Sequence, residues 1–254
     1  MLERDPYEGL SRRTLLCAAF TGFTTLPIFG QAGGGKRLKV VVAGAHPDDP
    51  ETGAGGTMAR YSALGHDVVS LYLTRGEAGI RGSSHKQAAE IRTTEAEEAC
   101  RILGARAVFA GQVDGAAEVN SARYGEFYKV LAGLAPNIVF THFPVDTHRD
   151  HRAASMLTFD CWQRSGRKFA LYFFEVLTGD QTQNFHPTSY VDITGTEVLK
   201  RKACYAHKSQ GPAEFYPEHE AMSLFRGREC GVKYAEAFVG AKQNGSTSSG
   251  LPGL

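Results

Sequence analysis

Short runs of apolar, β-branched residues alternate with longer amphipathic segments along most of this chain. The runs predict strands, and the segments between them predict helices. We expect strands at 38–42, 68–74, 107–110, 138–141 and 170–176, and helices at 55–64, 86–103, 122–134, 151–166 and 194–207. Because the strand runs lack polar–apolar alternation, both faces of the sheet must be covered. The pattern therefore predicts an α/β, Rossmann-like three-layer fold with a mostly parallel central sheet.

The length and charge of the chain fit one large domain and exclude one class of partner. The chain has 254 residues, of which 42% are hydrophobic and 22% are charged, and its formal net charge is +1. A domain of this size buries a substantial core. The near balance of charge provides no basic surface, so we expect no nucleic-acid partner. Nothing in the sequence specifies an oligomeric state.

The first 32 residues have the features of an export signal. The paired arginines Arg12 and Arg13 precede a moderately apolar segment that ends in Gly30-Gln31-Ala32, a plausible cleavage site. We therefore predict a twin-arginine-type signal peptide over 1–32. The protein would be exported, periplasmic or extracellular, and would have no stable membrane span once the signal is removed.

The remaining domain boundaries follow from glycine and serine content. Three consecutive glycines begin a linker at 33–37, and the folded domain is expected over 38–243. The Gly/Ser-rich segment 244–254 is predicted to be a disordered tail.

A group of polar residues directly follows the first predicted strand. His46, Asp48, Asp49 and Glu51 lie within six positions of one another. Grouped carboxylates repel each other and lose solvation when partly buried, and a divalent cation resolves that conflict. Zinc binds histidine nitrogen and aspartate oxygen, and a spare carboxylate beside it can act as a base. The same turn lacks the G-x-G-x-x-G pattern, and its carboxylates would repel a pyrophosphate, so a nucleotide cofactor is disfavoured.

A second polar group follows the fourth predicted strand. Residues 141–151 contain three histidines and two aspartates: His142, Asp146, His148, Asp150 and His151. The carboxyl ends of parallel strands meet at one edge of a sheet, so we expect the two groups to converge there. If His151 begins a helix, His148 precedes its first turn and both can face one cleft. Asp150 lies between them and can orient one imidazole.

Together the two groups resemble a known family. The pattern A-H-P-D-D-x-E from Ala45 and the pattern D-x-H-x-D-H from Asp146 are similar to the motifs of the LmbE/PIG-L family of zinc-dependent N-deacetylases. Shorter matches occur at 74–79, 92–96 and 207–210, and the resemblance covers nearly all of the chain after residue 37. Arg149 departs from the family, in which many members have proline, and it leaves the motif's histidines and aspartates intact.

The resemblance implies specific roles in the metal site. One Zn²⁺ per chain would be bound by His46, Asp49 and His151. Asp48 would be the general base that activates water. His148 would stabilise the oxyanion or protonate the leaving amine, and Asp150 would keep His148 in the required tautomer.

The resemblance also points to residues near the substrate. Arg92 matches a family position thought to meet the polar groups of the substrate, with a salt-bridged helix residue as the alternative. Four residues are expected to bind substrate or lie near the cleft: Arg75, Arg92, His207 and Gln210. Asp114 is interpreted as a turn residue. Four other histidines are expected at the surface: His66, His85, His186 and His219.

The main functional hypothesis is a zinc-dependent hydrolase that removes an N-acetyl group from an N-acetylglucosamine-type amino sugar or glycoconjugate. A first alternative is a dinuclear hydrolase of the metallo-β-lactamase type, although the first histidine of its H-x-H-x-D-H motif is missing at Asp146. A second alternative is an exported sugar-binding protein without turnover, which is disfavoured because every apparent catalytic position is filled.

Overall fold

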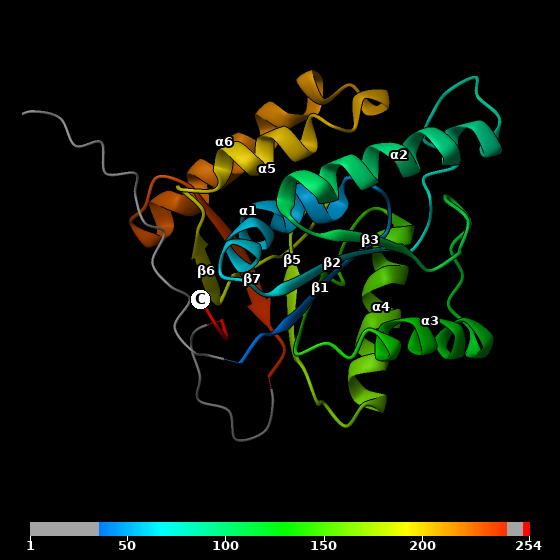
Figure 1. Ribbon diagram of the computed structural model, residues 1–254, viewed down its shortest axis with the longest axis horizontal. Coiled ribbons are helices and arrows are strands. Elements are labelled where there is room, and N and C mark those ends of the chain that lie inside the picture. Colours follow the sequence, from blue (N-terminus) through cyan, green and yellow to red (C-terminus); the bar gives the residue numbers. More distant parts are fainter. Residues whose placement is uncertain (1–35, 243–250) are drawn as a thin grey trace, which may run out of the picture. The chain divides into compact units, whose positions relative to one another are not determined.

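The computed structural model describes residues 36–242 and 251–254 (Figure 1). Its strands are β1 (Lys39–Gly44), β2 (Asp67–Tyr72), β3 (Arg106–Phe109), β4 (Ile138–His142), β5 (Ala170–Phe174), β6 (Ser189–Asp192) and β7 (Ala235–Gly240). Its helices are α1 (Asp49–Ala63), α2 (His85–Leu103), α3 (Ser121–Gly133), α4 (Arg149–Arg164), α5 (Glu197–Cys204) and α6 (Pro212–Cys230), with a 3₁₀ turn η1 (Lys208–Gln210).

The seven strands form one sheet in the order β3-β2-β1-β4-β5-β7-β6. Strands β1 to β5 pair in parallel, while β7 is antiparallel to both β5 and β6. The sheet is therefore mostly parallel, which confirms the predicted fold class. The strand order reverses between β1 and β4, where polar groups from two loops can meet.

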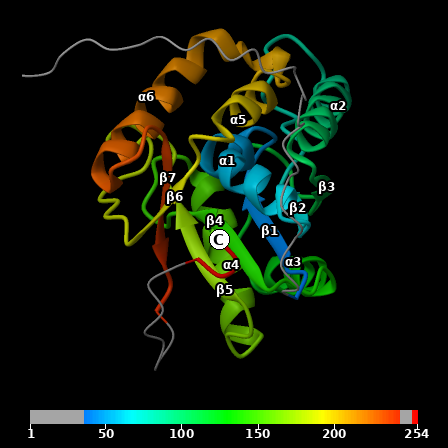
Figure 2. The same cartoon turned by 60° about the vertical axis from the view of Figure 1, so that its left-hand side comes forward.

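Alternate residues of β1 enter two different cores. Val40 and Val42 pack with α1, α2 and α5 on one face of the sheet, while Val41 and Ala43 pack with α3 and α4 on the other. Figures 1 and 2 show these two helical layers on opposite sides of the strands. Burial of both faces explains why the strand runs read as continuously apolar.

Helix α1 is broken near its start. Ala54 has a non-helical φ of −147°, and the predicted helix at 55–64 corresponds to the part of α1 that follows this break. A Cβ on Gly53 would lie 2.4 Å from the Phe174 ring, and one on Gly56 would lie 2.6 Å from Ile193. The glycines therefore allow α1 to pack closely against its neighbours.

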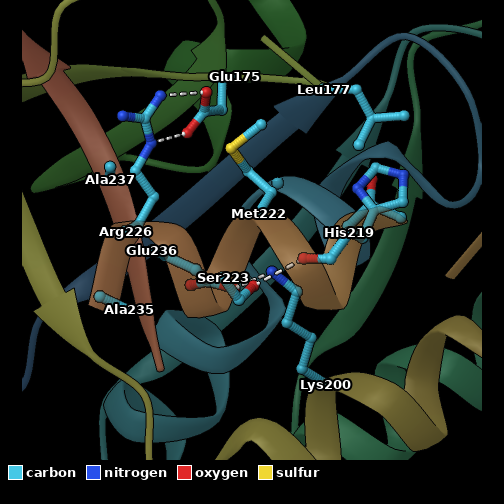
Figure 3. Close-up of a pocket in the computed structure, with 12 residues that line it drawn as sticks. Glu175, Leu177, Lys200, His219, Met222, Ser223, Arg226, Ala235, Glu236 and Ala237 are labelled. Atoms are coloured by element: carbon cyan, nitrogen blue, oxygen red, sulfur yellow. Dashed lines mark hydrogen bonds and ion pairs between the residues drawn. The ribbon is translucent and has the colours of Figure 1, made fainter. Parts of the chain in front are cut away.

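A buried ion pair stabilises this break. The Glu236 carboxylate accepts hydrogen bonds from the backbone N–H groups of Gly56 at 2.9 Å and Thr57 at 2.8 Å. Lys200 Nζ lies 2.8 Å from the same carboxylate, and both side chains are almost fully buried (Figure 3). The carboxylate from β7 therefore binds backbone donors inside α1, and Lys200 balances its charge.

Lys200→Met is expected to destabilise the protein by about 3 kcal/mol, because it leaves a buried carboxylate without its cation. Urea unfolding of this variant can be compared with Lys202→Met, a matched change at an exposed lysine of the same helix. Equal free energies of unfolding for the two variants would contradict the role assigned to the pair.

The end of the chain differs from the prediction. Within the segment 244–254, expected to be disordered, residues 251–254 are packed against the domain. Leu251 is buried, and the Tyr61 hydroxyl donates a hydrogen bond to the Pro252 carbonyl at 2.9 Å. The Gly/Ser-rich composition predicts disorder, but the segment also contains an apolar residue, Leu251, that packs into the core.

The signal-peptide prediction for 1–32 falls on residues outside the described part of the chain. Within 36–242 and 251–254, none of the helices has the length and apolar character needed to cross a membrane.

Three elements were not predicted: β6, α6 and β7. Helix α6 contains Pro217 within its span. Apolar and polar residues occur at both its buried and its exposed positions, so the helix has no clear apolar stripe. Its position matters for function, because α6 supplies one side of the cavity described below.

Candidate metal and catalytic site

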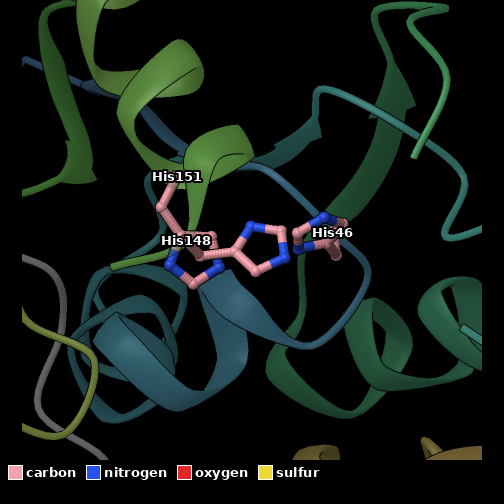
Figure 4. A group of neighbouring side chains, drawn as sticks. All are labelled: His46, His148 and His151. Atoms are coloured by element: carbon pink, nitrogen blue, oxygen red, sulfur yellow. The ribbon is translucent and has the colours of Figure 1, made fainter. Parts of the chain in front are cut away.

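The two polar groups expected to converge lie together at the carboxyl ends of β1 and β4. These strands are hydrogen-bonded neighbours in parallel register. Figure 4 shows the rings of His46, His148 and His151 gathered at this edge. The centroids of His46 and His148 are 4.8 Å apart, and those of His148 and His151 are 4.7 Å apart.

Asp49, the first residue of α1, lies between two of the histidines. Its Oδ2 accepts the His46 backbone N–H at 2.7 Å and is 3.3 Å from His46 Nδ1. Its Oδ1 is 3.4 Å from His151 Nε2. Burial opposes ionisation of Asp49, but the charge of His151 and the close contacts with the His142 and His151 rings hold its pKa well below the usual value. The structure thus brings together the three residues expected to bind metal.

His151 is oriented by Asp146, not by Asp150. His151 Nδ1 lies 3.1 Å from Asp146 Oδ1, so the Nε2 atom faces Asp49. Asp146 also accepts the His148 backbone N–H at 2.7 Å and the Thr182 hydroxyl at 3.0 Å. A histidine whose second nitrogen contacts a carboxylate is the usual arrangement of a metal-binding imidazole. Burial lowers the pKa of His151, but Asp49 and Asp146 raise it to about 9. The surroundings of this imidazole therefore favour a positive charge.

Asp150 occupies a different position from the one expected. Its Oδ2 is 3.3 Å from His46 Nε2 and accepts the Gly115 backbone N–H at 2.7 Å. The prediction that its carboxylate orients His148 is therefore wrong. Instead, the backbone N–H of Asp150 donates to His148 Nδ1 at 3.3 Å, because His148 is the N-cap of α4. This contact leaves the proton of a neutral His148 on Nε2.

Asp48 adopts a strained backbone and contacts Arg92. Its φ is 111°, a region that non-glycine residues rarely occupy and that often marks functional sites. Arg92 Nη2 donates to Asp48 Oδ2 at 2.8 Å and also to the Pro47 carbonyl. Burial raises the pKa of Asp48 above its usual value, although the Arg92 guanidinium opposes this shift. Arg92 therefore orients the expected base and favours its ionised form.

Two further residues belong to the site although they were not assigned a role. Asp114, interpreted as a turn residue, has its Oδ1 3.1 Å from His46 Nε2. His142 Nε2 is 3.2 Å from Asp49 Oδ2, and its ring stacks on His151 with centroids 4.0 Å apart. Burial and the charge of His151 lower the pKa of His142 to about 4, so the ring stays neutral. Asp114 follows β3, whose carboxyl end lies at the same sheet edge, so its sequence position could have indicated that it belongs to the site.

The donor atoms fit a divalent cation. Among the described residues, three sets have ligand atoms within 4.8 Å of one another: His46, His148 and His151; Asp49, His142 and His151; and His46, Asp114 and Asp150. Imidazole nitrogen and carboxylate oxygen are the donors that zinc accepts. Asp49 is buried among three imidazoles, and its low pKa favours the carboxylate form. A bound divalent cation would balance this negative charge.

The site opens into a cavity of about 500 Å³. This size falls within the range of small-molecule sites, about 300–1,000 Å³. Residues from several segments of the chain line it: His46, Asp48, Asp49, Thr52, Ala78, Gly79, Arg92, Asp114, Gly115, His148, His151, Val176, Leu177, Gln181, Gln210, Phe215 and His219.

The expected substrate-binding residues divide into two groups. Arg92 and Gln210 line the cavity, and Gln210 Nε2 donates to the Gly79 carbonyl at 3.3 Å. His207 does not line it, because it is fully buried with its Nε2 3.5 Å from Glu51 Oε2. Arg75 is exposed, with its guanidinium 5.1 Å from the Phe109 ring centroid, and is also absent from the lining. The structure therefore brings only half of this set to the cavity.

Of the four histidines expected at the surface, His85 and His186 are exposed, His66 is partly buried, and His219 was predicted wrongly. It was expected at the surface, but it is buried on α6 and lines the cavity. Because α6 was not predicted, no sequence pattern connected this residue with the motifs.

Comparison with known proteins identifies the family. The PIG-L profile, described as GlcNAc-PI de-N-acetylase, matches residues 41–162. A conserved protein of solved structure from Thermus thermophilus is 31% identical, and the match covers 83% of this chain and all of that one, with a TM-score of 0.71. The chain belongs to the PIG-L family. This result confirms the resemblance seen in the two motifs.

Two further PIG-L relatives are named for their activity. The diacetylchitobiose deacetylase of Thermococcus kodakarensis is 29% identical over 78% of this chain and 81% of its own length. The structure of N,N'-diacetylchitobiose deacetylase from Pyrococcus horikoshii, bound to an inhibitor, is 26% identical over 80% of this chain and 84% of that one, with a TM-score of 0.71. The profile match ends within α4, so α6 lies outside it.

Proposed function

We propose that the protein hydrolyses the N-acetyl group of an N-acetylglucosamine-type amino sugar or glycoconjugate, with one zinc ion as cofactor. The observation that carries the proposal is Asp48, held by Arg92 beside the donor group at the base of the cavity. The activities of the two named deacetylases support the same reaction class.

The metal is assigned to His46, Asp49 and His151. A bound zinc ion would supply a Lewis acid that activates water and polarises the amide carbonyl. Asp146 holds His151 with its Nε2 toward Asp49, and Asp150 and Asp114 contact the far nitrogen of His46. These carboxylates keep the ligand rings in position and raise their basicity.

The protein side chains carry the proton transfers. Asp48 accepts the proton of the attacking water, and the Arg92 contact at 2.8 Å holds its carboxylate in position. His148, neutral with its proton on Nε2, donates a hydrogen bond to the oxyanion, and the proton that Asp48 takes from water passes to the leaving amine. Burial and the charge of His46 lower the pKa of His148, which favours this neutral form.

The polar lining of the cavity provides contacts for sugar hydroxyl groups. Arg92, Asp114 and Gln210 lie along it, and the backbone of Gly79 is next to Gln210. We also propose, from residues 1–32, that the protein is exported and meets an envelope glycan or an environmental sugar.

Asp146→Asn is expected to weaken zinc binding by about tenfold, because it removes the negative charge behind His151 and keeps the side-chain shape. The measurement is competition for zinc with a chromophoric chelator. Asp180→Asn, an exposed aspartate in the loop that pairs with Asp146, is the matched control. A zinc affinity equal to that of the control would contradict the role of Asp146.

The function itself is tested by acetate release from purified protein. The substrates are N-acetylglucosamine, N,N'-diacetylchitobiose and an N-acetylglucosaminyl inositol. We expect acetate from at least one of them, in amounts equal to the free amine formed. Binding of these sugars without acetate release would favour the sugar-binding alternative and contradict the proposal.

A further inference from the structure

Helix α6 presents a histidine to the cavity that the proposed mechanism does not use. His219 is 9% exposed and lines the cavity together with Phe215, which lies one turn earlier on the same helix. The two rings are perpendicular, with centroids 5.8 Å apart and an interplanar angle of 89°. Together they form an aromatic wall, which we call the α6 wall.

The imidazole of His219 lacks a protein partner. Across residues 36–242 and 251–254, neither ring nitrogen takes part in a hydrogen bond or an ion pair, although the ring is more than nine-tenths buried. A buried polar group without a partner is costly, so such a group is normally satisfied by a ligand or by water. The cavity is the place from which that partner can come.

The charged side chains on the other side of the His219 ring are already paired with one another. A hollow of about 20 Å³ adjoins the ring and is lined by two ion pairs, Glu175–Arg226 and Lys200–Glu236. Arg226 binds Glu175 with two contacts of 2.6 and 2.7 Å, so each pair is satisfied within itself. Figure 3 shows the His219 ring beside Leu177, a residue that also lines the catalytic cavity.

His219 is also uncharged under ordinary conditions. Burial and then the charge of Lys200 lower its pKa to about 3. A neutral imidazole can donate one hydrogen bond and accept another, which suits a hydroxyl group better than an ion. Phe215 beside it is half-buried and offers an apolar ring face.

We propose that the α6 wall binds the sugar ring of the substrate: His219 forms a hydrogen bond with a ring hydroxyl, and Phe215 packs against the apolar face of the ring. This inference rests on the proposed function for the identity of the sugar. Because α6 lies outside the segment matched by the family profile, the wall is a place where this chain sets its own substrate range.

The test is calorimetric binding of glucosamine, the sugar without its acetyl group, to the zinc-loaded protein. His219→Phe keeps an aromatic ring and removes both nitrogens, and we expect it to weaken glucosamine binding about tenfold. Phe215→Leu should weaken it several-fold. His219→Asn, which keeps a donor and an acceptor, should bind more tightly than His219→Phe.

Two controls separate sugar contact from general damage. Phe225→Leu changes a 52% exposed aromatic residue of the same helix outside the cavity, and its glucosamine affinity should stay within about twofold of wild type. Acetate, which lacks the sugar, should bind His219→Phe as tightly as it binds wild type. With an active substrate, KM should rise while kcat stays within about twofold.

The result that overturns the inference is an unchanged glucosamine affinity in His219→Phe and Phe215→Leu, a parallel loss of acetate binding, or no sugar binding by wild type. A fall in kcat with unchanged KM would also overturn it, because it would place His219 in the chemical step. Failure of acetate release alone would contradict the proposed function and leave the sugar-binding result standing.

Discussion

Asp48→Asn is expected to lower kcat for acetate release by about 10²–10⁴-fold, because it removes the general base and keeps the side-chain shape. The amide oxygen can still accept the hydrogen bond from Arg92, so the strained turn before α1 should persist. The measurement is steady-state acetate release, accompanied by the zinc content of the variant, which should stay near that of wild type.

The matched control for this variant is Asp67→Asn. Asp67 begins β2 at the opposite end of the sheet from the site. Its acetate release should equal that of wild type. Undiminished turnover in Asp48→Asn would show that another group accepts the proton, and zinc loss in that variant would show that Asp48 binds the metal.

Removal of the metal is expected to abolish measurable acetate release, and added zinc should restore it. Without a cation, Asp49 is held in a crowded group of buried imidazoles and carboxylates, so the chelated protein should also unfold at a lower temperature. His151→Ala should reproduce the loss of activity, because it removes one of the proposed ligands.

His186→Ala, at an exposed histidine, is the control for the metal experiment and should keep full activity. We expect one zinc per chain by elemental analysis. Activity that survives complete chelation would contradict the proposed cofactor, and a content near two per chain would support the dinuclear alternative.

The parallel part of the fold could be predicted because its central strands, β1, β2 and β4, are buried on both faces. Runs such as 38–42 and 138–141 are mostly apolar, with a single polar residue in each, and the observed β1 and β4 lie within a few residues of the predicted ranges. The antiparallel edge was missed for the opposite reason. Strand β6 is partly exposed, and α6 contains an internal proline, so neither shows a clear period.

The sequence predicted where the site lies, but it did not predict which side chains contact one another there. The two motifs end neighbouring strands, and this topology alone brings His46 close to His151. The contacts of the aspartates depended on backbone geometry. Asp150 turns toward His46 and Asp146 turns toward His151, because α4 begins at Arg149, earlier than expected.

By itself, the sequence determined the mostly parallel sheet, the convergence of the two motifs and the chemical types of their side chains. These follow from periodicity and from strand ends, which are local properties. Only the tertiary structure decided that Asp48 turns toward Arg92 while Asp49 turns toward the histidines, and that α6 brings His219 to the cavity. Adjacent aspartates have the same chemistry in sequence, and a positive φ at the first of them sends their carboxylates to different partners.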